Sequence, residues 1–193
     1  MATTMSITPQ ASHKALLAAL LCAAVAASFL PVSSSAGASS SLPPLVSQTC
    51  RRTSSPPLCL DLLQSSNRSN AATTVRELAV VALTAARRSV LRARLRALDL
   101  GHGARGSVVD RLVARCAALY GDCLRAGARA LGQVSTMPAY DDRAGDAVSA
   151  LRAFPVKCEG LFRLWKLASP LEQVNRETED KLGVASEIVH LLG

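Results

Sequence analysis

The chain has 193 residues and a formal net charge of +8, from 22 Lys and Arg against 14 Asp and Glu. Hydrophobic residues make up 49% of it but aromatic residues only 3%, so the core has to be built from Ala, Leu and Val, which favours helices over sheets. Only three His are present and the strings GxSxG and HExxH do not occur. The composition therefore argues against the common hydrolases, and we predict a protein that is not an enzyme and needs no cofactor or metal.

The first 38 residues differ in composition from the rest. A polar start with Lys14 precedes an apolar run over residues 15–30, and a small-residue tract follows that contains Ala36 and Ala38. This order is typical of a secretory signal peptide. A retained anchor is the alternative, but the run of 16 residues is short for a membrane span. We predict a signal peptide over residues 1–38, a mature domain over 39–193, and no membrane association after cleavage.

Residues 42–69 contain four prolines, which leaves room only for short helical pieces. We predict an N-terminal hairpin there. Asn67, followed by Arg68 and Ser69, forms a glycosylation sequon. In a secreted chain Asn67 is a candidate glycosylation site.

Residues 70–193 show the periodicity of four long amphipathic helices. Ser107 and Asp110 resemble a capping box at the second start, and Asp141 or Asp142 begins the third helix. The predicted apolar positions include Leu91, Leu95 and Leu98 on the first helix and Trp165 on the third. A kink is expected at Pro155.

The start of the fourth helix is predicted from three residues, with Ser169 as the N-cap, Pro170 as the first helical residue and Glu172 as the end of a capping box. Four such helices joined by short links make an all-α, up-down-up-down four-helix bundle. An extended coiled coil would need heptads without Gly and Pro stops, and such stops are present.

Five cysteines remain after the leader: Cys50, Cys59, Cys116, Cys123 and Cys158. In an oxidising compartment an odd number implies pairs and one leftover thiol. A bridge between Cys50 and Cys59 would fix the hairpin, and one between Cys116 and Cys158 would join the second and third helices, but the spacing leaves other pairings open.

Several strings resemble the plant invertase and pectin methylesterase inhibitor family. They begin with Thr49-Cys50-Arg51-Arg52-Thr53 and Pro56-Pro57-Leu58-Cys59, and continue with Val75-Arg76-Glu77-Leu78-Ala79, Cys116-Ala117-Ala118-Leu119-Tyr120, Cys158-Glu159-Gly160-Leu161-Phe162 and Ser169-Pro170-Leu171. The resemblance spans residues 45–192. It implies a four-helix bundle after a helical hairpin, Cys50–Cys59 and Cys116–Cys158 disulfides, and Cys123 as an extra, free thiol.

The resemblance also implies a function. Members of this family bind a secreted plant carbohydrate enzyme one to one and block its active-site cleft. Invertase inhibitors often carry Pro-Lys-Phe before the third bundle helix, whereas this chain has Pro138-Ala139-Tyr140. The missing Lys favours pectin methylesterase as the target. Acid invertase, cell-wall or vacuolar, is the alternative, because Ser169-Pro170-Leu171 and Asn175 occur in invertase inhibitors too.

The resemblance places the interface on bundle helices two to four. We therefore take four residues at the start of the third helix as enzyme-binding candidates: Tyr140, Asp141, Asp142 and Asp146. Acids at a helix start also act as plain caps.

An arginine cluster ends the first long helix, formed by Arg87, Arg88, Arg92, Arg94 and Arg96. One interpretation of this cluster is a solvent-exposed helix face. The other is weak electrostatic association with the polyanionic pectin of the cell wall. The leader and the scarcity of aromatic residues for base stacking argue against nucleic acid. A secreted helical bundle without inhibitory activity is the remaining alternative to an extracellular inhibitor in the apoplast.

Overall fold

Two short helices open the part of the chain that the computed structural model describes, which comprises residues 43–101, 106–136 and 141–193. Helix α2 spans Pro44–Cys50 and α3 spans Pro56–Gln64. Both begin with proline, whose missing N–H costs nothing in the first helical turn. The 3-10 helix η1 follows over Asn67–Ala71. Residues 41–193 form one compact unit, and the predicted leader lies outside the described residues.

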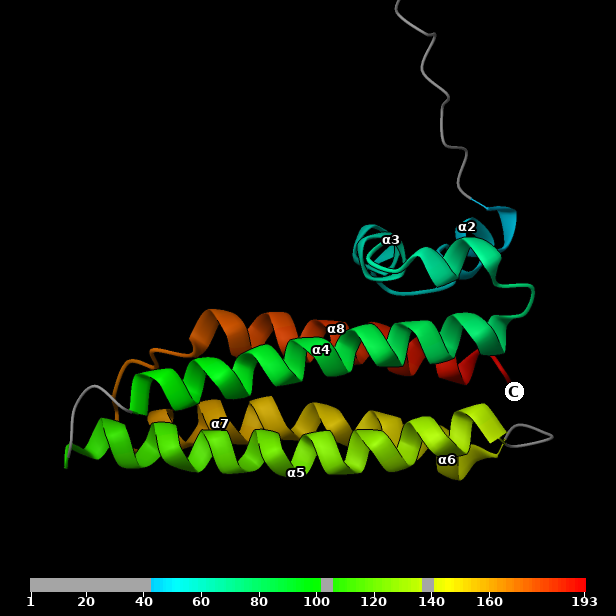
Figure 1. The fold of residues 1–193 in the computed structure, drawn as a ribbon. Coiled ribbons are helices and arrows are strands. Elements are labelled where there is room, and N and C mark those ends of the chain that lie inside the picture. Colours follow the sequence, from blue (N-terminus) through cyan, green and yellow to red (C-terminus); the bar gives the residue numbers. More distant parts are fainter. Residues whose placement is uncertain (1–42, 102–105, 137–140) are drawn as a thin grey trace, which may run out of the picture. The chain divides into compact units, whose positions relative to one another are not determined.

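The bundle consists of four helical rods. Helix α4 spans Val75–Gly101, α5 spans Val108–Thr136 and α8 spans Glu172–His190. The third rod combines α6 (Asp142–Ser149), η2 (Ala150–Arg152) and α7 (Ala153–Leu164). Helices α4 and α8 form one layer, and α5 lies beside α6 and α7 in the other (Figure 1). The predicted up-down-up-down bundle after a helical hairpin is confirmed.

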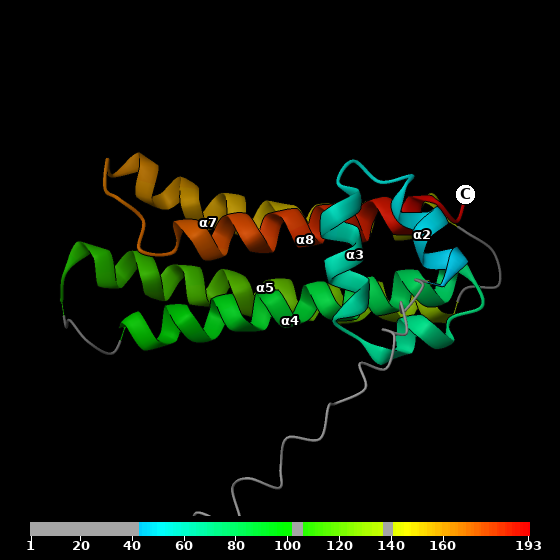
Figure 2. The ribbon, with the colours of Figure 1, turned by 90° about the horizontal axis from the view of Figure 1, so that it is seen from above.

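The hairpin packs across the α4–α8 layer, and α3 crosses both helices in Figure 2. Ser54, between α2 and α3, donates hydrogen bonds from its backbone N–H (2.8 Å) and its hydroxyl (2.6 Å) to the Glu187 carboxylate of α8. The hairpin therefore covers α4 and α8 and leaves α5 and α7 uncovered in this part of the chain.

Helix starts agree with the sequence where a side chain can cap the backbone. The Ser107 N–H donates to Asp110 Oδ2 (2.9 Å) and the Asp110 N–H to Ser107 Oγ (3.0 Å), which is the predicted capping box. Asp141 caps α6 by accepting the Arg143 N–H at 2.9 Å. A further capping box at α4, between Thr74 and Glu77, was not predicted.

The predicted core face of α4 is wrong in its C-terminal half. Leu91, Leu95 and Leu98 are exposed, and the adjacent row of Val90, Ala93 and Ala97 is buried. Both rows repeat every three or four residues, so periodicity does not separate them. The small side chains of the buried row let α5 and α8 approach α4 closely.

The third rod is interrupted next to the proline at which a kink is expected, but its predicted core aromatic residue is wrong. Pro155 lies inside α7, and the irregular segment is η2, just before it. Pro155 has no N–H for the Leu151 carbonyl, so the chain tightens into a 3-10 turn ahead of the proline. Trp165, predicted in the core, is exposed because α7 ends at Leu164, and Phe162 is the buried aromatic residue.

Helix α8 begins at Glu172, two residues later than predicted. Leu171 is turned into the core, and the Ser169 hydroxyl accepts the Leu171 N–H at 3.2 Å in a local turn. The Glu172 carboxylate pairs with Arg176 at 2.7 Å, so the predicted capping box with Ser169 is wrong.

Two observations concern dinucleotide binding and membrane insertion. Residues 101–106 have the spacing GxGxxG, but the first glycine, Gly101, is the last residue of helix α4, whereas the dinucleotide-binding fingerprint follows a strand. Within the described residues, no helix has the length and apolar character needed to span a membrane.

Candidate functional site

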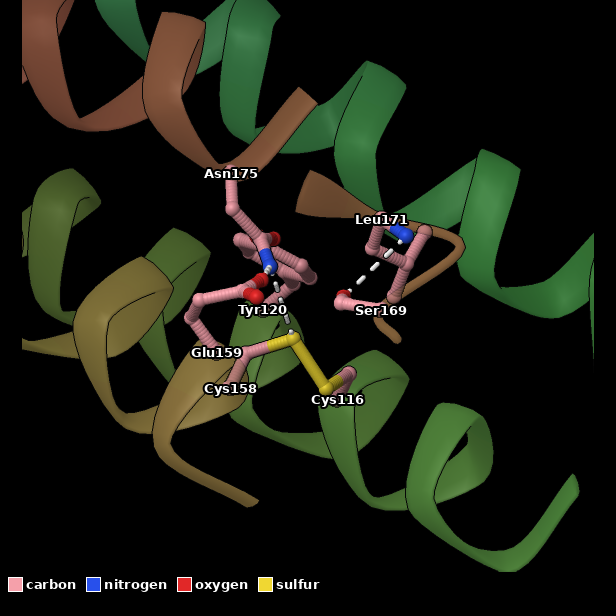
Figure 3. Close-up of a disulfide and its surroundings, with 7 residues drawn as sticks. All are labelled: Cys116, Tyr120, Cys158, Glu159, Ser169, Leu171 and Asn175. Carbon is pink, nitrogen blue, oxygen red and sulfur yellow. Dashed lines mark hydrogen bonds between the residues drawn. A yellow bond between two sulfur atoms is a disulfide. The ribbon is translucent and has the colours of Figure 1, made fainter. Parts of the chain in front are cut away.

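Two disulfides fix the framework. Cys50–Cys59 joins α2 to α3 with a Cα–Cα distance of 5.4 Å, and Cys116–Cys158 joins α5 to α7 with 5.0 Å. These are the pairs that the family resemblance implies. The second bridge holds the third rod against α5 at the level where α8 packs over both (Figure 3).

A buried polar cluster lies beside the Cys116–Cys158 bridge. The Tyr120 hydroxyl of α5 donates to Asn175 Oδ1 of α8, and Asn175 Nδ2 donates to Glu159 Oε2 of α7 at 2.6 Å. The same amide nitrogen lies 3.4 Å from the Cys158 sulfur (Figure 3). Tyr120 is fully buried and Asn175 is nearly so. One chain of hydrogen bonds thus connects three helices.

Burial determines the protonation state of this cluster. Desolvation raises the pKa of Tyr120 well above its ordinary range, and the negative charges of Cys123, once that thiol ionises, and of Glu159 raise it further. The phenol therefore stays neutral and remains a donor to Asn175. The arrangement holds helices together and has no group activated as a nucleophile or base.

The cluster reaches the surface at a groove between α7 and α8. The groove has a volume of about 620 Å³, and its lining residues are Pro155, Val156, Glu159, Arg163, Leu167, Ala168, Ser169, Glu172, Asn175, Arg176 and Glu179. Both carboxylates and guanidinium groups line it, which suits recognition of a polar surface of mixed charge.

Several large apolar side chains of α7 and of the link after it are exposed. Val156 and Leu167 line it, and Leu164 and Trp165 lie between the lining residues Arg163 and Leu167 in the chain. Leu164 is 78% exposed and Trp165 is 55% exposed. Large exposed apolar residues together with a tryptophan are typical of protein–protein contact sites. We take this groove and its apolar rim as the candidate interaction surface, called the α7–α8 surface below.

The link from α7 to α8 is held in a fixed conformation. Lys166 adopts a φ of 53°, in the left-handed region. Its N–H donates to the Arg163 carbonyl at 3.1 Å, and the Leu167 N–H donates to the Phe162 carbonyl at 3.0 Å. This is a Schellman motif with lysine at the position that usually takes glycine. It directs the chain into the turn that presents Trp165.

The four enzyme-binding candidates predicted from the sequence lie at the start of the third rod. Tyr140 falls outside the described residues. Asp141 caps α6, and Asp142 and Asp146 are exposed. They share a rod with the α7–α8 surface but lie at the opposite end of it (Figure 1). Sequence reasoning missed the groove because its residues come from two helices.

Asn67 is exposed at the start of η1. The Ser69 hydroxyl, which completes the sequon, is buried and donates to the Leu63 carbonyl. The asparagine that would carry a glycan is therefore at the surface, on the hairpin side of the bundle.

Cys123 is a free, buried thiol on α5. Its sulfur lies 3.8 Å from the Leu151 carbonyl oxygen. Burial raises the pKa of Cys123 to about 12, with the nearby Arg87 acting in the opposite direction. A thiol with so high a pKa is not a nucleophile near neutral pH.

We expect Cys123 in the native protein to resist alkylation at pH 8 and to react only on unfolding. Because the folded state holds a proton that the unfolded state releases, this thiol's contribution to stability should fall as pH rises from about 9 toward 12, by up to about 1.4 kcal/mol per pH unit. Thiol labelling and urea unfolding at several pH values would measure both effects. The Cys123→Ala variant is the control and should show a shallower decline. Rapid labelling at pH 8 without unfolding would contradict this description.

Comparison with known proteins gives one family. The family model described as plant invertase/pectin methylesterase inhibitor matches residues 44–185, from the first residue of α2 to within α8. No curated protein matches the chain significantly.

Proposed function

Because this chain belongs to the plant invertase/pectin methylesterase inhibitor family, we propose that it inhibits a plant cell-wall pectin methylesterase by reversibly covering the enzyme's active-site cleft, one to one. The family's description limits the target to an invertase or a pectin methylesterase. Blocking a cleft requires surface complementarity and no catalytic group. The neutral Tyr120 and inert Cys123 are consistent with that requirement.

One sequence observation carries the choice of target. Pro138-Ala139-Tyr140 stands where invertase inhibitors often have Pro-Lys-Phe, so the lysine is missing. This departure favours pectin methylesterase. Acid invertase is the second candidate, supported by Ser169-Pro170-Leu171 and Asn175, which invertase inhibitors share.

We assign the contact with the enzyme to the α7–α8 surface, which lies on the third and fourth bundle helices, and leave the second bundle helix, α5, outside the contact. Trp165, Leu164 and Leu167 supply the apolar anchors, and the carboxylates and guanidinium groups of the groove supply a polar surround. A standard interface buries about 800 Å² on each partner, which two adjacent helices of this length can provide. The third rod also carries Asp142 and Asp146, with Tyr140 just before it, so a larger footprint would include the candidates from the sequence.

The site of action is extracellular in this proposal. Residues 1–38 act as a signal peptide and are removed, and residues 39–193 form the inhibitor domain in the apoplast. Members of this family are generally extracellular. Two disulfides support the same conclusion, because such bonds persist in oxidising compartments. Asn67, exposed on the hairpin side, is then available for glycosylation.

Replacing Trp165 by alanine should weaken inhibition of pectin methylesterase at least about tenfold, because interface tryptophans are often binding anchors. Its 55% exposure means that the change should alter thermal stability little. Inhibition constants and melting temperatures measured side by side would show both.

The matched control for Trp165→Ala is Leu95→Ala. Leu95 has the same 55% exposure but lies on α4, no residue of which lines the groove. It should leave inhibition unchanged. Equal inhibition constants for wild type and Trp165→Ala would remove Trp165 from the interface.

A further inference from the structure

Charge is divided unequally among the helices. Helices α4 and α5 together carry ten arginines and four acidic residues. Helix α8 alone carries five acidic residues against two basic ones. Helices α4 and α5 pack against each other along their length (Figure 1). Taken together, the exposed surfaces of these two helices, called the α4–α5 face below, carry more arginines than acids and are therefore net basic.

The guanidinium groups of this face are available to a ligand. Arg88, Arg115 and Arg129 are exposed and form none of the hydrogen bonds or ion pairs in the described part of the chain. Arg96 and Arg125 pair only with acids three residues away and stay more than half exposed.

Two more arginines lie in the seam between the helices. A Cβ at Gly127 would lie 3.2 Å from Arg87 Cδ, and one at Gly121 would lie 3.8 Å from Arg94 Cζ. The glycines of α5 thus provide the space in which the arginines of α4 lie. The Nε atoms of both arginines are buried and have no hydrogen-bond partner in the described structure. Since a donor without a partner carries a cost, an anion that draws these guanidinium groups outward would relieve it.

An arginine guanidinium pairs bidentately with a carboxylate or a phosphate, so several exposed arginines suit a ligand that carries many such groups. The only aromatic residue of α4 and α5 is Tyr120, which is buried, so the face offers nothing for base stacking. A second copy of the chain that met this face with its own α4–α5 face would bring arginines against arginines, which is repulsive. Exposed Leu91 and Leu95 lie among the arginines and suit a partner with apolar C–H surface, as pyranose rings have.

We propose that the α4–α5 face binds a linear polyuronate, an acidic polysaccharide with free carboxylates along its chain. Helices α4 and α5 form one side of the bundle, and α7 and α8 form the side opposite to it (Figure 1). The polysaccharide and an enzyme on the α7–α8 surface can therefore be bound together.

The consequence for regulation rests on the proposed function. An inhibitor of pectin methylesterase that also binds polyuronate would respond to the de-esterified polymer that its target enzyme produces. Hydrolysis of a pectin methyl ester by water yields a carboxylate, methanol and a proton. Each turnover therefore adds a negative charge to the polymer, and the local concentration of a basic inhibitor rises with the carboxylate density. Inhibitor would accumulate where the enzyme has already acted.

The test uses the mature protein and polygalacturonate chains of matched length with low or high methyl esterification, with no enzyme present. Binding is measured by calorimetry over a series of salt concentrations. We expect binding to the low-ester polymer that weakens steeply with salt, and at least about tenfold weaker binding to the high-ester polymer at 50 mM salt, because fewer counterions are released.

The deciding variant replaces Arg88, Arg115 and Arg129 by glutamine, a good helix former. The control removes the same charge elsewhere, by glutamine at Arg143, Lys157 and Lys181. The first variant should lose at least about tenfold in affinity for the low-ester polymer, and the control no more than about threefold. Equal losses in the two variants, equal binding of the two polymers, or binding of a DNA oligonucleotide without binding of polygalacturonate would overturn the proposal. The same first variant should inhibit pectin methylesterase as wild type does, so failure of polymer binding and failure of inhibition are separate results.

Discussion

Replacing Cys116 and Cys158 together by alanine should lower the free energy of unfolding by about 4 kcal/mol. The bridge closes a loop with a sequence separation of 42, and removing it releases that loop's entropy in the unfolded chain. It also frees α7 from α5 beside the buried polar cluster. Urea unfolding followed by circular dichroism, under non-reducing conditions, measures the change.

The second disulfide is the internal comparison for this prediction. Cys50–Cys59 has a separation of only 9, so its double alanine variant should cost about 2.5 kcal/mol. A larger loss for the Cys50/Cys59 variant than for the Cys116/Cys158 variant would contradict the entropic account.

The Asn175→Ala variant should be destabilised by about 3 kcal/mol. It leaves the buried Tyr120 hydroxyl without an acceptor and removes the donor that Glu159 accepts from. Tyr120→Phe removes only one hydrogen bond and should cost about 1–2 kcal/mol. Because the two residues share a bond, the double variant should cost less than the sum of the single variants.

Gln173→Ala is the matched control for Asn175→Ala. It removes an amide from the same helix, but Gln173 is exposed and bonds only to Glu177 at 3.0 Å. It should change stability by no more than about 0.5 kcal/mol. If both variants had the same small effect, the buried cluster would not hold the three helices together.

The bundle was predictable because its main signals are local. The capping boxes and prolines mark where helices begin, and the row from Leu112 through Cys116 and Tyr120 to Cys123 has one consistent period. Where a helix carries two rows of apolar residues with the same period, the period does not decide which row is buried. On α4 the leucines Leu91 and Leu95 are the more hydrophobic row, yet the alanine row is buried, because close helix approach depends on the neighbours and not on α4 alone.

The candidate site was less predictable for the same reason. Its groove joins Glu159 and Arg163 of α7 to Arg176 and Glu179 of α8, which no local pattern connects. Trp165 has the spacing of a core residue, and only the end of α7 at Leu164 places it at the surface. The cysteine pairing came from the family resemblance, since spacing leaves other pairings open.

The central claim, inhibition of a pectin methylesterase, is tested most directly by titrating the purified mature protein against plant pectin methylesterase and, in parallel, against acid invertase at mildly acidic pH. We predict loss of pectin methylesterase activity that reaches its limit at one equivalent and reverses on dilution, with acid invertase unaffected. Inhibition of invertase alone would contradict the choice of target, and inhibition of neither enzyme would contradict the proposed function.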